Sequence, residues 1–423
     1  MRSVLLLLAC SLLPAQTLLV RAGRLLDVRS GMLQADQGIV IAADRITAVG
    51  PWDSLSARTP KDVKRLDLSA RTVLPGLIDA HVHVFLQGNL TRADYEAQIL
   101  KESVPYRALR AAAAAKRALE QGFTTLRDLG TEGAGHADSD LKKAIDAGVV
   151  HGPRLQVADL AFSSTGTYPL LGFAWELAVP SGVQVVDGVE AIRKGVREQV
   201  RFGADWIKVY VDRGYWIAED GRLRSKLNFS TEELQAFVAE AKRLGKPTSA
   251  HASGWDGIDA ALTAGFDTIE HGYGFDEGLM DRAIRQGTWW CPTMHTIVYV
   301  NEGRGGSYRK MPDILFKAFR RAVEKGVKIA CGSDAGAFPW SEPLWKELDQ
   351  YAQHGMTRLQ ALQSATLRAA ELMGLEKDLG SLEAGKLADL VAVEGNPLED
   401  LAALGRVSLV LKAGRVVHAT AKE

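Results

Sequence analysis

The chain has 423 residues, with 51 Lys and Arg balanced by 51 Asp and Glu, so its formal net charge is zero. A nucleic-acid-binding protein usually carries a basic excess, and we therefore expect no nucleic-acid partner. The composition, with 47% hydrophobic and 24% charged residues, is that of an ordinary globular protein. The length allows several domains, although a single α/β barrel often takes about 250 residues or more.

Residues 1–16 have the pattern of a secretory signal peptide. An apolar run follows Arg2, and small residues offer a cleavage site near Ala15. The run is too short to span a bilayer. Residues 7–10 also resemble a bacterial lipoprotein cleavage site, which would leave Cys10 as a lipidated first residue. We expect an exported protein, periplasmic or extracellular, with a lipid anchor at Cys10 as the alternative to cleavage near Ala15. An apolar N-terminal strand is the remaining interpretation.

The two ends of the remaining chain look alike. Short apolar runs separated by turn residues fill 17–73, where no helical period is convincing, and the same pattern returns over 380–423. We therefore predict one small β-sandwich domain built from both chain ends. The segment 74–379 would be a separate domain inserted between them.

Within 74–379, strands alternate with amphipathic helices, which is typical of α/β proteins with a parallel sheet. Eight strands are expected, over 74–83, 124–130, 153–162, 205–210, 246–251, 266–271, 288–293 and 327–334. Helices are expected over 105–121, 140–147, 189–202, 230–244, 256–264, 277–286, 314–325, 345–354 and 358–373. Eight parallel strands are the number that closes a (β/α)8 TIM barrel, and this is the predicted fold.

Polar residues stand at the exits of several predicted strands, where the active sites of such barrels lie. His81 and His83 are spaced i, i+2, so in an extended strand both side chains point to one face and can bind one metal ion. This spacing alone is weak evidence. The exits of strands four, five, six and eight strengthen it by adding Lys208, His251, His271 and Asp334.

Lys208 is unusual in this group, because a protonated amine is no metal ligand and is costly to bury in an apolar strand. Reaction of the amine with carbon dioxide would give a carbamate, whose two oxygens can bridge two cations. The alternative is a structural ion pair between Lys208 and Asp334 or another carboxylate.

The sequence resembles the amidohydrolase superfamily, in its imidazolonepropionase-like and Xaa-Pro dipeptidase-like branch. The matching motifs are distributed over nearly the whole chain after the predicted signal peptide. They are Pro75–His83, Asp128–Gly135, Ala204–Tyr210, Ala250–Ala252, Thr268–Gly272, Gly332–Asp334 and Gly385–Leu390. The resemblance implies hydrolysis at a carbon centre, mostly of amides, and constrains the substrate only loosely.

The resemblance also implies roles for the residues at the strand exits. The more buried metal ion would be bound by His81, His83 and Asp334, and the more exposed one by His251 and His271. Lys208, as N6-carboxylysine, would bridge the two ions together with a hydroxide. The cofactors would be two divalent ions, with zinc as the first expectation, although manganese, cobalt or iron also fit the ligand set.

Further residues are assigned to catalysis and substrate binding. Asp334 would pass the proton of the attacking water to the leaving amine, and Lys208 would act through its bridging carbamate. Tyr210 would hydrogen-bond the substrate carbonyl, unless it is a packing aromatic. Tyr168 stands where dipeptidase-like relatives often have a His, which weakens the case for dipeptidase specificity. His295 is a candidate substrate contact or a solvated loop residue. Candidates to bind a substrate carboxylate are Arg213, Arg304 and Arg309.

Three functions remain open at this point. The first is a binuclear metal-dependent amidohydrolase that cleaves a small-molecule amide or peptide, such as an Xaa-Pro dipeptide or an N-acyl amino acid, by attack of a metal-bridging hydroxide. The second is a mononuclear cyclic-amide hydrolase or deaminase, against which Lys208 argues. The third is a non-enzymatic binding barrel, against which the complete set of ligands argues. A homo-oligomer is compatible with all three.

Overall fold

The computed structural model describes residues 17–90, 93–168 and 172–420. The predicted signal peptide, with Cys10, lies outside the described residues. In the described part of the chain, no helix has the length and apolar character needed to cross a membrane.

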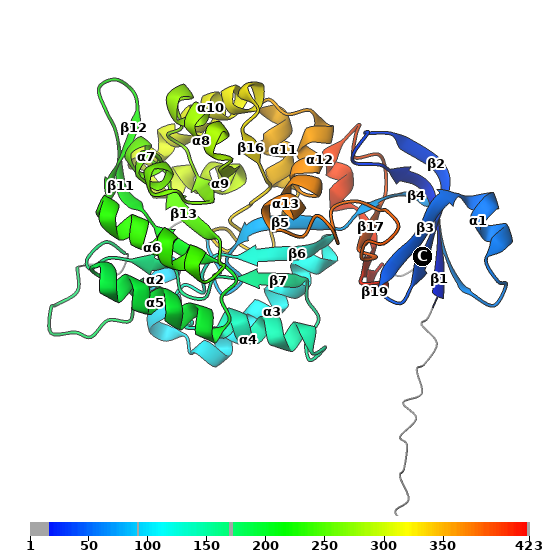
Figure 1. Cartoon of the computed structure of the whole chain (residues 1–423), viewed down its shortest axis with the longest axis horizontal. Coiled ribbons are helices and arrows are strands. Elements are labelled where there is room, and N and C mark those ends of the chain that lie inside the picture. The colour runs from blue at the N-terminus through cyan, green and yellow to red at the C-terminus, as the bar shows by residue number, and fades with distance from the viewer. Residues whose placement is uncertain (1–16, 91–92, 169–171, 421–423) are drawn as a thin grey trace, which may run out of the picture.

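The two chain ends share one seven-stranded sheet (Figure 1). Its N-terminal strands are β1 (Thr17–Leu26), β2 (Leu33–Ala42), β3 (Arg45–Pro51) and β4 (Lys64–Pro75). Its C-terminal strands are β17 (Leu390–Val393), β18 (Val407–Lys412) and β19 (Arg415–Ala419). The strand order is β19-β18-β17-β4-β1-β2-β3, so β17 pairs directly with β4 and joins the ends of the chain.

Residues 17–73 contain one helix, which no helical period in the sequence indicated. Helix α1 spans Trp52–Arg58, directly after β3. It has seven residues, and Leu55 is its only buried one. A helix this short, with a single apolar anchor, does not complete the i, i+3, i+4, i+7 pattern by which a sequence reveals a helix.

The segment between the two ends forms a TIM-barrel-like arrangement of parallel strands. One sheet contains β5 (Leu77–Val82), β6 (Phe123–Asp128) and β7 (Arg154–Val157). A second sheet, in the order β16-β15-β14-β13-β10-β8-β9, contains β8 (Phe162–Ser163), β9 (Gln184–Val185), β10 (Ile207–Tyr210), β13 (Thr248–Ala252), β14 (Thr268–His271), β15 (Trp289–Cys291) and β16 (Lys328–Ile329). Backbone hydrogen bonds cross between the sheets on both sides, from Ala80 N to Cys331 O (2.8 Å) and from Asp205 N to Val157 O (2.8 Å).

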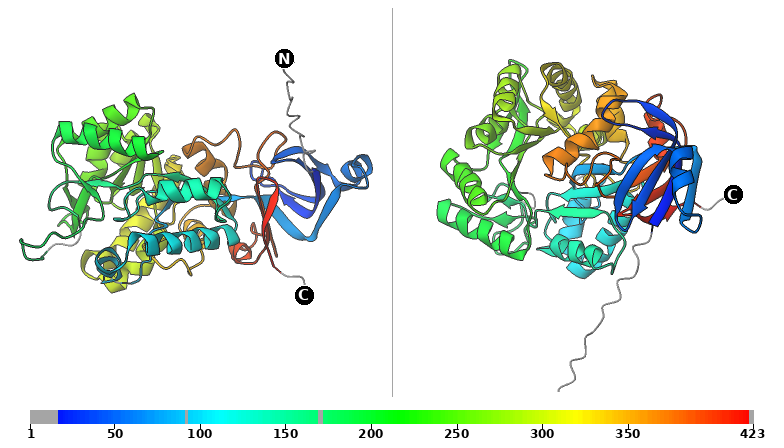
Figure 2. Two further views of the ribbon diagram at one scale, coloured as in Figure 1. Left: turned by 90° about the horizontal axis from the view of Figure 1, so that it is seen from below. Right: turned by 45° about the vertical axis from the view of Figure 1, so that its right-hand side comes forward.

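Helices lie around the outside of these strands, and the sheet of the chain ends lies at one side (Figure 2). The helices are α2 (Ala93–Lys101), α3 (Val104–Glu120), α4 (Ala137–Asp146), α5 (Val189–Phe202), α6 (Thr231–Arg243), α7 (Trp255–Ala264), α8 (Glu277–Gln286), α9 (Met294–Arg304), α10 (Met311–Lys325), α11 (Lys346–Gln353), α12 (Arg358–Ser364) and α13 (Leu367–Leu372). Short 3-10 helices span Gly306–Lys310 and Leu401–Gly405.

Several element boundaries differ from the sequence prediction. The strand expected over 153–162 is two short strands, β7 and β8, which belong to different sheets. The helix expected over 358–373 is interrupted between α12 and α13. The hairpin of β11 (Asp212–Ile217) and β12 (Leu223–Leu227), which follows β10, was not predicted. This hairpin and helix α9, which was also not predicted, supply residues to the cleft described below.

Candidate active site

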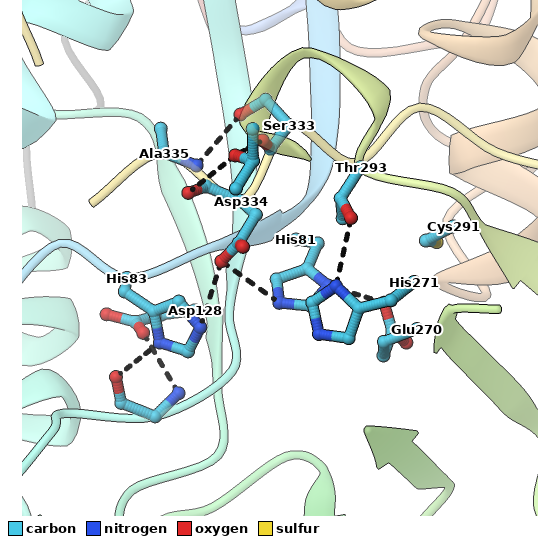
Figure 3. A network of polar contacts seen from close by, with 12 residues as sticks. His81, His83, Asp128, Glu270, His271, Cys291, Thr293, Ser333, Asp334 and Ala335 are labelled. Carbon is cyan, nitrogen blue, oxygen red and sulfur yellow. Dashed lines mark hydrogen bonds and ion pairs between the residues drawn. The ribbon is translucent and has the colours of Figure 1, made fainter. Parts of the chain in front are cut away.

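His81, His83 and Asp334 come together at the exit of β5 (Figure 3). Their ligand atoms all lie within 4.8 Å of one another, and all three residues are buried. Asp334 Oδ1 is 3.6 Å from His81 Nε2 and 3.4 Å from His83 Nε2. Two imidazole nitrogens and a carboxylate oxygen at this separation can hold one divalent metal ion.

In both His81 and His83, the ring nitrogen that faces away from Asp334, Nδ1, forms a hydrogen bond with a protein group. His81 Nδ1 donates to Glu270 Oε2 (2.7 Å), and His83 Nδ1 donates to the carbonyl of Gly130 (2.8 Å). A proton on Nδ1 leaves Nε2 with a free lone pair, which is the form that binds metal. Burial, with the nearby Lys208 charge, lowers the pKa of His81 well below its usual range and keeps the ring neutral. The hydrogen bonds therefore orient both Nε2 atoms towards Asp334.

His251 and His271 lie beside this group. The ring centroids of His271 and His81 are 5.1 Å apart, and those of His271 and His251 are 4.4 Å apart. His271 Nδ1 is hydrogen-bonded to Thr293 Oγ1 (2.9 Å), while His251 Nε2 is hydrogen-bonded to the hydroxyl of Tyr215 (2.6 Å). Burial lowers the pKa of both rings well below the usual value. Each neutral ring thus has one nitrogen fixed by the protein and the other left for a ligand.

Lys208 is buried on β10, with only 1% of its surface exposed. In the described part of the structure its Nζ has no hydrogen-bond partner and forms no ion pair. The structural ion pair with Asp334 that the sequence left open is therefore not present. Burial lowers the pKa of Lys208 to about 8, so an appreciable fraction of the amine is unprotonated near neutral pH.

A carboxylate that sequence reasoning missed lies on the wall of the cleft. Glu132 accepts hydrogen bonds from the hydroxyls of Tyr210 (2.9 Å) and Tyr168. The guanidinium of Arg213 lies 4.6 Å from the ring centroid of Tyr168 and 4.7 Å from that of Tyr210. Because the Tyr210 proton is directed to Glu132, a hydrogen bond to a substrate carbonyl would require Tyr210 to exchange this partner.

The predicted substrate-binding residues are only partly brought together. Arg213 and Arg304 line the cleft, whereas Arg309 pairs with Glu302 on the surface (3.6 Å). His295 does not line the cleft but packs edge-on against Phe338, with ring centroids 5.1 Å apart. His295 lies in the first turn of α9, which directs its side chain away from the cleft. The sequence pattern had instead placed this residue in a loop, as a substrate contact or a solvated side chain.

The cleft encloses about 1030 Å³ of empty space, counted with its open mouth. Its lining combines the polar group already described with apolar and aromatic side chains, among them Leu86, Tyr95, Tyr273, Ile297 and Tyr308. An amide substrate with an apolar portion is compatible with this surface.

A second missed feature is a fully buried charge pair beneath His81. Arg127 on β6 donates to Glu270 Oε1 (2.9 Å), and Glu270 also accepts from Ser249 Oγ (2.8 Å). Although burial alone would raise its pKa, the charge of Arg127 and the hydrogen bond from His81 hold the pKa of Glu270 well below its usual range. The sequence did carry a signal, because Arg127 and Glu270 are opposite charges in two strands predicted to be buried, and buried charges need a partner.

Comparisons with known proteins identify the family of this chain. The sequence pattern of the amidohydrolase family matches residues 72–417. Ochratoxinase of Aspergillus niger is 31% identical, covering 92% of this chain and 83% of that protein. Imidazolonepropionase of Symbiobacterium thermophilum is 26% identical over 96% of this chain and 97% of that protein. The crystal structure of a Xaa-Pro dipeptidase with bound methionine in the active site has 35% identity and a TM-score of 0.84, covering 95% of this chain and 99% of that one. The chain therefore belongs to the amidohydrolase family and is a hydrolase that acts on carbon–nitrogen bonds.

Proposed function

We propose that this chain is a binuclear metal-dependent amidohydrolase that cleaves an amide or peptide bond in a dipeptide or an N-acyl amino acid. The observation that carries the proposal is the buried amine of Lys208, which has no hydrogen-bond partner among the described residues. It lies among histidines such as His81 and His271, whose Nδ1 atoms already form hydrogen bonds within the protein. The relatives named ochratoxinase and Xaa-Pro dipeptidase support an amide or peptide substrate.

The residues present fit a pair of metal ions. His81, His83 and Asp334 would hold one ion, while His251 and His271 would hold the other. In the described structure, His81 Nε2 is buried without a hydrogen-bond partner, as Lys208 Nζ is, and this is expected of a metal-ligand atom. Two divalent ions, with zinc as the first candidate, would supply a water of lowered pKa and a polarised carbonyl.

Lys208 would contribute to this site as a carbamate. Its neutral amine adds to carbon dioxide and loses a proton, which gives an anion with two oxygens. The unprotonated amine is the reactive form in this addition, and the burial of Lys208 favours it over the ammonium. The carbamate would also remove the need for a buried ammonium without a counter-ion.

Asp334 is placed to move the proton of the reaction. Its Oδ1 lies between the Nε2 atoms of His81 and His83, and it lines the cleft as well. We propose that this carboxylate accepts a proton from the attacking water and delivers it to the leaving amine. The backbone N–H of Asp334 donates to the carbonyl of His81 (2.7 Å), which fixes the carboxylate relative to the strand that carries the two histidines.

The decisive measurement is metal content in protein purified with bicarbonate, compared with Lys208→Ala. We expect close to two metal ions per chain in the unmodified protein, with a sharp loss of metal and of amide hydrolysis in the variant. Lys412→Ala is the matched control, because Lys412 is also a lysine of lowered pKa but donates to Gly152 O (2.7 Å) outside the site. One metal ion per chain, unchanged by Lys208→Ala, would support the mononuclear cyclic-amide hydrolase instead.

Arg213 is our candidate to bind the substrate carboxylate. It lines the cleft, and no carboxylate within 4.0 Å pairs with it in the described structure. Arg213→Gln should raise KM for a substrate with a free carboxylate by about 10- to 100-fold, the loss of one charged hydrogen bond. The KM for the matching carboxamide substrate should change little. In the control variant Arg309→Gln, the KM values for the carboxylate and the carboxamide substrate should both stay near those of the unmodified protein. Equal loss for carboxylate and carboxamide substrates would contradict this role.

The remaining sequence expectations stay part of the proposal. We propose that eight strands close into a barrel over 74–379 and that 17–73 and 380–423 form a β-sandwich. Hydrogen bonds across both seams of the barrel and the pairing of β17 with β4 support this division. We also propose that the protein is exported, so that its substrates are amides met outside the cytoplasm.

A further inference from the structure

The start of helix α9 contacts two of the strand exits that carry proposed metal ligands. Thr293, directly before the helix, is hydrogen-bonded through Oγ1 to His271 Nδ1 (2.9 Å) and to the hydroxyl of Tyr273 (3.0 Å). One turn later, Thr296 Oγ1 donates to the carbonyl of Ser333 (2.7 Å), the residue before Asp334. The position of this helix end therefore determines how the side chain of His271 is held.

This helix end lacks the usual local cap. Thr293 has a left-handed backbone conformation (φ 50°), which is unfavourable for a β-branched residue, and its side chain makes no capping hydrogen bond. Its hydroxyl is directed to His271 instead. The first N–H groups of the helix must consequently be satisfied from elsewhere in the chain.

Glu347 satisfies them from helix α11. Its Oε1 accepts from Met294 N (2.7 Å) and its Oε2 accepts from His295 N (2.6 Å). The side chain of Glu347 is completely buried, and it is not one of the residues that line the cleft. A buried carboxyl group whose two oxygens each accept from a backbone N–H group is placed to fix the helix end, and the proposed reaction makes no use of it.

We propose that Glu347 is a positioning residue, which holds the start of α9 so that Thr293 keeps the His271 ring oriented for metal binding. This inference rests on the proposed function, because it treats His271 as a metal ligand. Glu347 acts through Thr293 and touches neither a metal ligand nor the substrate. The effect of losing it should therefore appear first in metal retention at the more exposed position and only then in hydrolysis.

Glu347→Gln tests the inference with little change in shape. Glutamine keeps one acceptor oxygen but turns an NH2 group towards the second backbone N–H. We expect zinc to leave the more exposed position about 10- to 100-fold faster in a chelator assay, in the range found when groups that orient a metal-binding histidine are changed. The visible spectrum of the cobalt-loaded protein should change as well, and kcat should fall more than KM changes. Glu371→Gln is the matched control, since Glu371 pairs with Arg368 (3.0 Å) on the surface and contacts neither α9 nor the cleft.

Thr293 provides a second test that does not depend on the folding of the Glu347 variant. Thr293→Ala should reproduce the faster loss of zinc, whereas Thr293→Ser, which keeps the hydroxyl, should restore retention. The double variant Glu347→Gln/Thr293→Ala should be no worse than either single one, because both act on one contact.

The two proposals fail in different ways. If the unmodified protein binds two metal ions and Glu347→Gln releases them at the unmodified rate, the positioning role is wrong and the binuclear function stands. Additive effects of Glu347→Gln and Thr293→Ala would also overturn the positioning role. If the unmodified protein binds no second metal ion, the binuclear function is wrong, and the inference on Glu347 is overturned with it.

Discussion

Asp334→Asn is expected to lower kcat/KM for amide hydrolysis by about a thousandfold or more, while the protein stays folded. General acid–base catalysis by one positioned group contributes about 10²- to 10⁴-fold, and an amide cannot take up the proton that a carboxylate accepts. The same change removes one of the three proposed ligands of one metal ion, the other two being His81 and His83. The two losses act on one reaction, so the total effect should exceed that of either role alone.

The stability of this variant separates catalysis from folding. Burial raises the pKa of Asp334 to about 6, which shows that its charge is unfavourable in the metal-free fold. A neutral side chain of the same shape should therefore leave the thermal unfolding temperature of the metal-free protein unchanged or slightly higher. Asp281→Asn is the control, because Asp281 pairs with Lys325 (2.7 Å) at the surface. More than about a hundredth of the original activity in Asp334→Asn would contradict the assigned role, since a positioned acid–base group contributes at least about 10²-fold.

The convergence of the proposed metal ligands at the strand exits was predictable, because the direction of a side chain on a strand follows from its position in the local sequence. His81 and His83 share a face through the two-residue period of a strand, and Lys208 and His271 lie on short strands that the apolar pattern reveals. Parallel strands end at the same edge, so residues far apart in sequence converge without any knowledge of their contacts.

The contacts around these residues were not predictable in the same way. The hydrogen bond from Tyr210 to Glu132 spans 78 residues, and that from Arg127 to Glu270 spans 143. Glu132 lies in a loop with a left-handed backbone (φ 52°), where no periodic pattern indicates which way the side chain points. His295 differs in the opposite direction: it was a candidate substrate contact, but the helix after Thr293 turns its ring away from the cleft and against Phe338. Side-chain direction in irregular segments depends on packing partners that one sequence does not reveal.

Arg127→Met is expected to cause the largest loss of stability among the changes considered, about 3–5 kcal/mol in the free energy of unfolding. Arg127 and Glu270 are both fully buried, and Arg127 is the permanent positive charge that balances the Glu270 carboxylate. Methionine keeps much of the side-chain volume but leaves a buried carboxylate next to His81 without its main partner. The measurement is urea unfolding of the metal-free protein, with Arg368→Met at an exposed ion pair as the control.

The double variant Arg127→Met/Glu270→Gln decides whether the loss comes from the unpaired charge. Removing both charges should recover a large part of the stability, because the glutamine carries no charge and its single oxygen can still accept from either Ser249 Oγ or His81 Nδ1. Metal affinity should not recover to the same extent, since the charged carboxylate that orients His81 and raises its basicity is gone. A double variant less stable than Arg127→Met would show that the pair stabilises the fold through more than mutual neutralisation. If stability recovers but metal affinity does not, Glu270 acts in metal binding by orienting His81, and Arg127 acts by neutralising the buried Glu270 carboxylate.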